Sequence, residues 1–136
     1  MKPTSYFSEI LPVTEEMNIE FVAGKLSYFY EQLHLLHWQT KGYAEHMAIG
    51  SLYGYVYEFK DEVIEKLMGY TGKRPKAFKI EPLSDGISCE LLLDQIESFS
   101  KQLISWAKIS GYCDIESITT SLSGMVAKTK YLLTLS

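Results

Sequence analysis

Three histidines, His34, His37 and His46, lie within 13 residues of one another. Further along the chain, Asp61 and Glu65 are four residues apart, so on a helix both carboxylates can reach the same ion. Imidazole nitrogen and carboxylate oxygen together suit iron or zinc. These residue types allow a metal site that combines histidines with the Asp61/Glu65 pair. In the plainer alternative, His37 packs at a helix end and the carboxylates lie on a solvated helix face.

The elements that must position these residues are four predicted helices. Apolar residues recur at helical spacing over about 17–40, 44–70, 89–110 and 114–133. The expected N-caps of the first, third and fourth helices are Thr14, Ser88 and Asp114. Glycine follows each of the first three helices, at positions 42, 72 and 111.

The lengths of the connections predict how the helices pack. Short links join helices one and two and helices three and four, whereas residues 72–87 form a long connection that contains two of the four prolines. Helices joined by a tight turn are antiparallel neighbours, and a long link allows a crossover. We therefore expect an all-α fold, an antiparallel four-helix bundle of the ferritin-like kind, formed by residues 1–136 as a single domain. Residues 1–13 should form an irregular N-terminal stretch.

The first predicted helix has apolar residues on two sides. Its core stripe consists of Val22, Leu26, Phe29, Leu33 and Leu36. A second stripe, nearly opposite, consists of Met17, Phe21, Tyr28 and Leu35. Because one bundle covers only one side of a helix well, we expect a partner subunit on the second stripe and hence a homo-oligomer. Isolated exposed apolar residues are the alternative.

The second predicted helix carries a mixed stripe on the side away from its core residues: His46, Gly50, Gly54, Asp61 and Glu65. A metal bound by this side would have to be shared with a second subunit. Each glycine costs about 1 kcal/mol relative to alanine in a helix interior. Close approach of another backbone would explain that cost.

The composition argues against several classes of protein. Thirteen Lys and Arg against 17 Asp and Glu give a net charge of -4, and no basic tail precedes the first helix, so we expect no tight binding to nucleic acid. No apolar run reaches the ~18 residues of a membrane span, and the N-terminus lacks a secretory signal. Cys89 and Cys113 make no disulfide framework. We therefore expect a cytoplasmic protein outside the membrane.

A short run of residues resembles a known family. The run His34-Leu35-Leu36-His37-Trp38-Gln39-Thr40-Lys41-Gly42 resembles the His-x-x-His-Trp-Asn-x-x-Gly signature of the Dps (mini-ferritin) family. Asp61-x-x-x-Glu65 is similar to that family's carboxylate pair, so the resemblance covers about residues 30–68. It implies a ferroxidase centre between two subunits, which would bind two irons and oxidise Fe(II) with peroxide inside a twelve-subunit shell.

The resemblance departs from the family's pattern on the second helix. If three residues are deleted so that His46 aligns with the family's second histidine, the acidic ligand one turn later falls on Gly50, which cannot ligate a metal. Without the deletion, Ile49 occupies the position of that histidine. The resemblance therefore implies a Dps-like protein that binds iron or a similar divalent metal between subunits, with His37, Asp61 and Glu65 as ligands, His46 as a fourth candidate, and weak or lost ferroxidase activity. The alternative is a ferritin-like assembly or interaction module without metal. Either protein would be a homo-oligomer, with a dimer as the minimum and a Dps-like dodecamer as the larger form.

Overall fold

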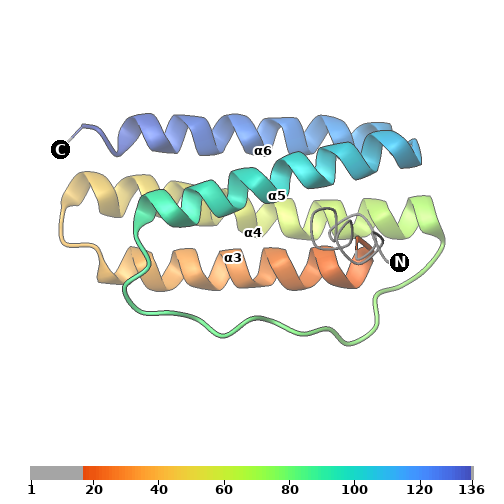
Figure 1. Ribbon diagram of the computed structural model, residues 1–136, viewed down its shortest axis with the longest axis horizontal. Coiled ribbons are helices and arrows are strands. Elements are labelled where there is room, and N and C mark those ends of the chain that lie inside the picture. Colours follow the sequence, from red (N-terminus) through yellow and green to blue (C-terminus); the bar gives the residue numbers. More distant parts are fainter. Residues whose placement is uncertain (1–16, 136) are drawn as a thin grey trace, which may run out of the picture.

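The computed structural model describes residues 17–135, which form four helices joined by two short turns and one long crossover (Figure 1). The helices are α3 (Ile19–Gln39), α4 (Tyr43–Thr71), α5 (Cys89–Ser110) and α6 (Cys113–Leu132). The described residues contain no strand. The predicted all-α four-helix fold is confirmed. Thr14 and residues 1–13 lie outside the described part of the chain, so the irregular N-terminal stretch stays a prediction. Helix α3 begins at Ile19, so the predicted start of this helix after a Thr14 cap is wrong.

Local signals explain most of the helix ends. The side chain of Asn18 accepts a hydrogen bond from the backbone N–H of Phe21 at 2.8 Å, so Asn18 is the N-cap of α3. Ser88 accepts from the N–H of Leu91 at 3.0 Å and caps α5 as predicted. Gly72 and Gly111 follow α4 and α5 with φ of 71° and 80°, a left-handed conformation that favours glycine.

The predicted N-cap of α6 is wrong by two residues. Helix α6 begins at Cys113, directly after Tyr112, which makes no side-chain cap hydrogen bond. Asp114 lies inside the first turn, where its negative charge suits the positive end of the helix dipole. The acidic residue favours this terminus through its charge, although its side chain does not cap the helix.

The helices pack as two antiparallel hairpins, α3 with α4 and α5 with α6. The hairpins meet because α4 packs against α6 and α3 against α5. Figure 1 shows the crossover returning along the length of the bundle, so α5 runs in the same direction as α4. This is the crossover topology that the long link predicted.

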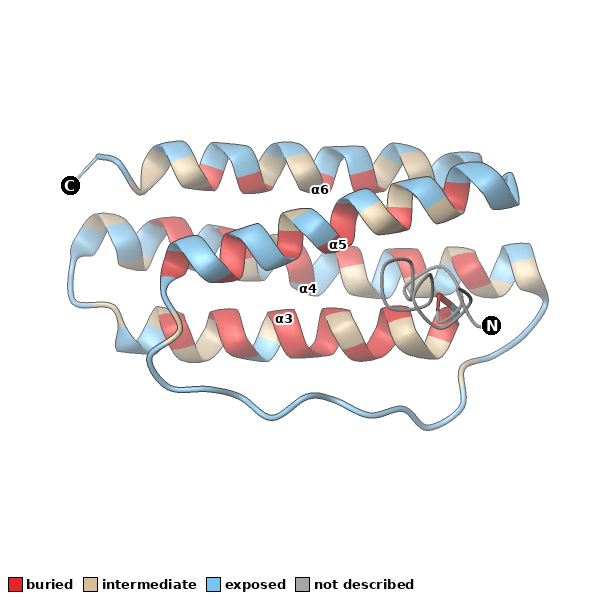
Figure 2. Cartoon of the chain, in the orientation of Figure 1, coloured by how far each residue is buried: buried red, intermediate tan, exposed pale blue. Residues whose placement is uncertain are grey.

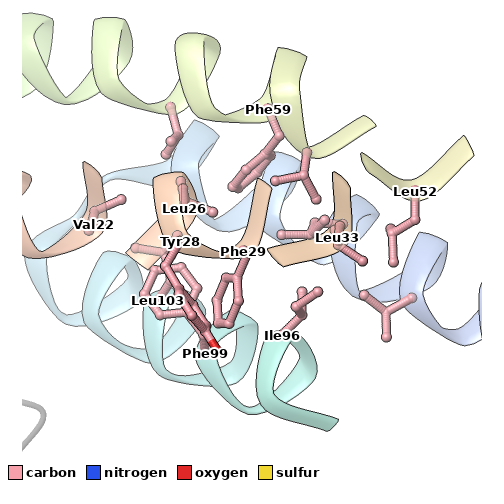
Figure 3. Close-up of a cluster of buried hydrophobic side chains, with 14 of the residues drawn as sticks. Val22, Leu26, Tyr28, Phe29, Leu33, Leu52, Phe59, Ile96, Phe99 and Leu103 are labelled. Atoms are coloured by element: carbon pink, nitrogen blue, oxygen red, sulfur yellow. The ribbon is translucent and has the colours of Figure 1, made fainter. Parts of the chain in front are cut away.

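All four helices contribute to one core of buried side chains (Figure 2). At its centre, the rings of Phe29 on α3 and Phe99 on α5 meet edge to face, with centroids 5.7 Å apart (Figure 3). The predicted core stripes of α3 and α4 face this core and are buried. They are Val22, Leu26, Phe29, Leu33, Leu36, Leu52, Val56, Phe59, Val63 and Leu67. The helical periodicity therefore identified the inward sides correctly.

The crossover is bound along the outer side of α3. The fully buried amide of Gln32 donates to the backbone oxygen of Ser84 at 2.9 Å and accepts from the Ser84 N–H at 2.8 Å. Lys25 pairs with Glu81 at 3.1 Å. A Cβ built on Gly24 would lie 2.5 Å from the backbone oxygen of Lys79, so only glycine allows the crossover to approach this closely.

The crossover and α5 together cover the second apolar stripe of α3. Met17 and Tyr28 are buried, and Phe21 and Leu35 are half-buried. Phe21 contacts Phe99 of α5, with ring centroids 6.3 Å apart. This stripe therefore requires no partner subunit, which removes the argument from which the homo-oligomer was inferred. A helix pattern alone does not show where a long connection returns.

Among the helices formed by residues 17–135, none has both the length and the apolar character needed to cross a bilayer.

Candidate functional site

Two of the predicted ligands, His37 and His46, form a pair within the chain. Their rings stack with centroids 3.8 Å apart and an interplanar angle of 23°. His37 Nδ1 lies 2.9 Å from the backbone oxygen of His46, and His46 Nδ1 lies 3.2 Å from the backbone oxygen of His37. Because a carbonyl oxygen only accepts, each Nδ1 carries the proton and donates it. The two hydrogen bonds join the last turn of α3 to the first turn of α4.

Gly50 provides the space for this histidine pair. A Cβ on Gly50 would lie 2.9 Å from Cε1 of His37, closer than real side chains tolerate. The expectation that this glycine admits a neighbouring backbone is wrong, since the ring of His37 fills the space. At Gly54, one turn further along, a Cβ would meet nothing within 4 Å. The two glycines therefore have different surroundings, although the helical pattern places them on the same stripe.

The predicted carboxylate ligands lie far from the histidine pair. Asp61 and Glu65 are exposed on the outer side of α4. Fifteen residues separate His46 from Asp61, roughly 22 Å along a helix. Among the described residues, no group of three or more His, Cys, Asp or Glu side chains could hold a metal ion. One chain therefore does not bring the four predicted ligands together.

The main feature of this side of the molecule is a ladder of aromatic rings across α3 and α4. His34 stacks on Tyr53 with centroids 4.6 Å apart and an interplanar angle of 12°. The His34 ring also lies 4.0 Å from that of Trp38. Tyr30 contacts both Tyr53 and Tyr57, at 5.7 and 5.4 Å. Rings at four-residue spacing on two antiparallel helices thus form one continuous surface.

We call this surface the aromatic face and define it as Tyr30, His34, Trp38, Tyr43, Met47, Tyr53 and Tyr57. Its outermost members are strongly exposed: Tyr43 by 79%, Trp38 by 67%, Tyr57 by 57% and Met47 by 50%. No binding surface at Tyr30 and His34 was predicted from the sequence. The signal was present, because Tyr30, His34 and Trp38 follow one another at four-residue intervals.

A lysine borders the ladder at its far end. Lys60 Nζ lies 5.7 Å from the ring centroid of Tyr30 and donates to Ser27 Oγ at 3.3 Å. A cation over an aromatic face is attracted by the ring quadrupole. Partial burial, together with the charge of Glu31, raises the pKa of Tyr30 above its ordinary value, so its phenol is neutral at physiological pH. The aromatic face is therefore largely uncharged.

Neither Cys89 nor the basic residues of the crossover add a reactive group to this surface. Burial and the nearby carboxylate of Glu45 raise the pKa of the Cys89 thiol to about 11, so it is protonated and unreactive near neutral pH. The basic residues Lys73, Arg74 and Lys76 line a separate pocket of about 520 Å³ next to the start of α3.

Comparison with known proteins relates the chain to uncharacterised ones. The model of a family of unknown function, DUF5856, matches residues 37–133. A protein of Enterobacteria phage T4, described as an uncharacterized 14.6 kDa protein in the mobD-ri intergenic region, is 29% identical over a 107-residue alignment. The match covers 75% of this chain and 77% of the phage protein. No solved structure matches the chain.

These matches correct the functional expectation. Neither is to a ferritin or a Dps protein, so the Dps resemblance is wrong, and with it the expected iron-binding function. The resemblance rested on a run of nine residues and a carboxylate pair, which any helical hairpin with His-Trp at its turn can contain. A shared bundle topology does not transfer a function. Because the family model spans most of the chain, the protein belongs to the DUF5856 family, whose function is unknown.

Proposed function

We propose that the protein is a self-associating module that binds a second copy of itself through the aromatic face. The observation that supports this proposal is the exposure of Tyr43, Trp38, Tyr57 and Met47 on one side of the α3/α4 hairpin. Aromatic residues and methionine are enriched in protein interfaces, whereas lysine and acidic residues are depleted from interface cores. The proposed homo-oligomer therefore forms through the aromatic face and not through the second apolar stripe of α3.

The size of the surface supports an interface. With about 200 Å² for a whole aromatic side chain, the exposed parts of Trp38, Tyr43 and Tyr57 amount to roughly 400 Å². Exposed apolar patches of this size on monomers are often functional. The half-buried rings and Met47 extend the surface toward the ~800 Å² that each partner contributes to a standard interface.

The rigidity of the surface also favours binding. Each ring of the ladder contacts between one and three others, and His34 contacts Tyr30, Tyr53 and Trp38. Tyrosine and tryptophan supply large contact area with only two rotatable bonds, so little conformational entropy is lost when they are covered. A preorganised aromatic surface of this kind has the character of an interaction hot spot.

Sedimentation velocity from low to high micromolar concentration tests the proposal. We expect the wild-type protein to reach twice its monomer mass of 15.5 kDa. Trp38→Ala and Tyr57→Ala should each weaken association by about thirtyfold, the ~2 kcal/mol of an interface hot spot. Tyr131→Ala is the matched control, because Tyr131 on α6 is 61% exposed and lies outside the aromatic face. A wild-type protein that stays at 15.5 kDa throughout would overturn the proposal.

A further inference from the structure

We infer that the two copies pair with their α4 helices antiparallel, about a two-fold axis that passes between Tyr53 and Gly54. This inference rests on the proposed self-association and specifies its geometry. Helix α4 is the longest helix of the described chain, and its outer side runs unobstructed beside the aromatic face. A symmetric dimer uses the same surface on both copies, so the surface must be complementary to itself.

The outer side of α4 is self-complementary in size about this point. Equal distances on either side of the axis place Gly54 opposite Tyr53 of the partner subunit. They also place Gly50 opposite the partner's Tyr57, so that each small residue faces a ring. Space is available at Gly54, where a Cβ would meet nothing within 4 Å. At Gly50 the neighbouring ring of His37 offers an aromatic surface instead.

The charges on this side of α4 also favour an antiparallel arrangement. Asp61 and Glu65 are exposed on its C-terminal half, and Lys41 is exposed at the turn that precedes its N-terminus. Position 66 lies directly opposite Lys41 in this register, but Lys66 faces α6 and forms ion pairs with Glu62 and Asp114, so the neighbouring Glu65 is the group that meets Lys41. An antiparallel dimer brings the acidic half of one α4 to the partner's Lys41. A parallel dimer would bring the acidic halves together, which is unfavourable.

Zero-length crosslinking of the wild-type protein tests the register without any substitution. A carbodiimide joins lysine to carboxylate only where the two groups touch. We expect covalent dimers that contain a Lys41–Glu65 crosslink, identified by mass spectrometry. Within one chain the two residues lie at opposite ends of α4, roughly 33 Å apart, so this link must join two chains. The internal control is the exposed Glu58, which lies about 10 Å along α4 from Glu65. Covalent dimers linked through Glu58 and not through Glu65 would overturn the register.

A cysteine at the expected axis gives a second readout. In a Cys113→Ser background, Gly54→Cys should form a disulfide-linked dimer under mild oxidation, because the two copies of position 54 lie almost on the axis. Glu58→Cys is the matched control, since its two copies would be about 13 Å apart along the helices, beyond disulfide reach. If the protein dimerises but gives neither Lys41–Glu65 crosslinks nor Gly54→Cys dimers, the register is wrong and the proposed self-association stands. If sedimentation shows only monomer, both are wrong.

Discussion

Gly50 and Gly54 show how one residue type can serve two purposes on the same helix. They are one turn apart on α4, yet one faces the ring of His37 and the other faces open space. At Gly50 the missing side chain allows the stacked histidine pair to form. At Gly54 the missing side chain has no function within the chain, and a helix-stabilising residue could replace it without a clash.

The two glycines should respond to alanine in opposite ways. In the monomeric Trp38→Ala/Tyr57→Ala background, Gly54→Ala should raise the free energy of unfolding by about 1 kcal/mol, the difference in helix propensity. Gly50→Ala gains the same propensity but displaces His37 and its hydrogen bond to His46, so we expect no gain or a net loss. Urea denaturation followed by circular dichroism measures both. Equal stabilisation by the two substitutions would show that the histidine pair contributes nothing.

At the scale of the elements, the crossover acts as a fifth packing element, which covers α3 beside the four helices. It has no regular secondary structure, so its backbone groups depend on side chains for hydrogen bonds. Gln32 satisfies both backbone groups of Ser84, 52 residues away, in the way a neighbouring strand would. This buried amide therefore connects α3 to the crossover that covers its second apolar stripe.

Removing this amide should destabilise the protein strongly. Gln32→Leu keeps the size of the side chain but leaves the N–H and C=O of Ser84 without partners, which we expect to cost about 2–3 kcal/mol. Gln39→Leu is the control, because its exposed hydrogen bond to Asp85 should contribute less than about 1 kcal/mol. Urea denaturation compares the two variants. If both variants lose a similar free energy of unfolding, the Gln32–Ser84 contact contributes no more to stability than the exposed Gln39–Asp85 hydrogen bond.

At the scale of the whole molecule, one side of the α3/α4 hairpin is buried and the other is exposed. The side of α3 that faces the crossover and α5 is buried by the chain itself. The side that carries the aromatic face is covered by no other described element. A dimer formed through that face would place the uncharged rings at the centre of the interface and the charged side chains at its rim, which is the usual arrangement in protein interfaces.

A charge swap across the proposed interface should be reversible. Lys41→Glu alone, or Glu65→Lys alone, places like charges opposite each other in both symmetric contacts and should weaken the dimer by roughly tenfold at low salt. The double variant Lys41→Glu/Glu65→Lys restores opposite charges and should recover most of the affinity. Glu58→Lys, about 10 Å along α4 from Glu65, should change affinity by less than about twofold. Sedimentation equilibrium at low and high salt provides the comparison, and failure of the double variant to recover would argue against the pairing.

The sequence alone determined the parts of this protein that depend on near neighbours. Helix positions, the inward stripes of α3 and α4, the cap at Ser88 and the glycine stops at Gly72 and Gly111 all follow from interactions within four or five residues, which a one-dimensional pattern contains. The long connection also predicted the crossover topology. The His-Trp run had no comparable support, because a motif of nine residues does not carry the tertiary setting that a metal site requires.

Only the tertiary structure decided which surfaces the chain covers and which it leaves open. Gln32 and Ser84 are 52 residues apart, and so the burial of the second α3 stripe beneath the crossover could not be read from local spacing. The stacking of His37 on His46 depends on how two helices meet at a turn, and the aromatic face depends on their alignment side by side. Burial and ring contact are properties of residues brought together in space, whereas helical periodicity records only the residues along one element.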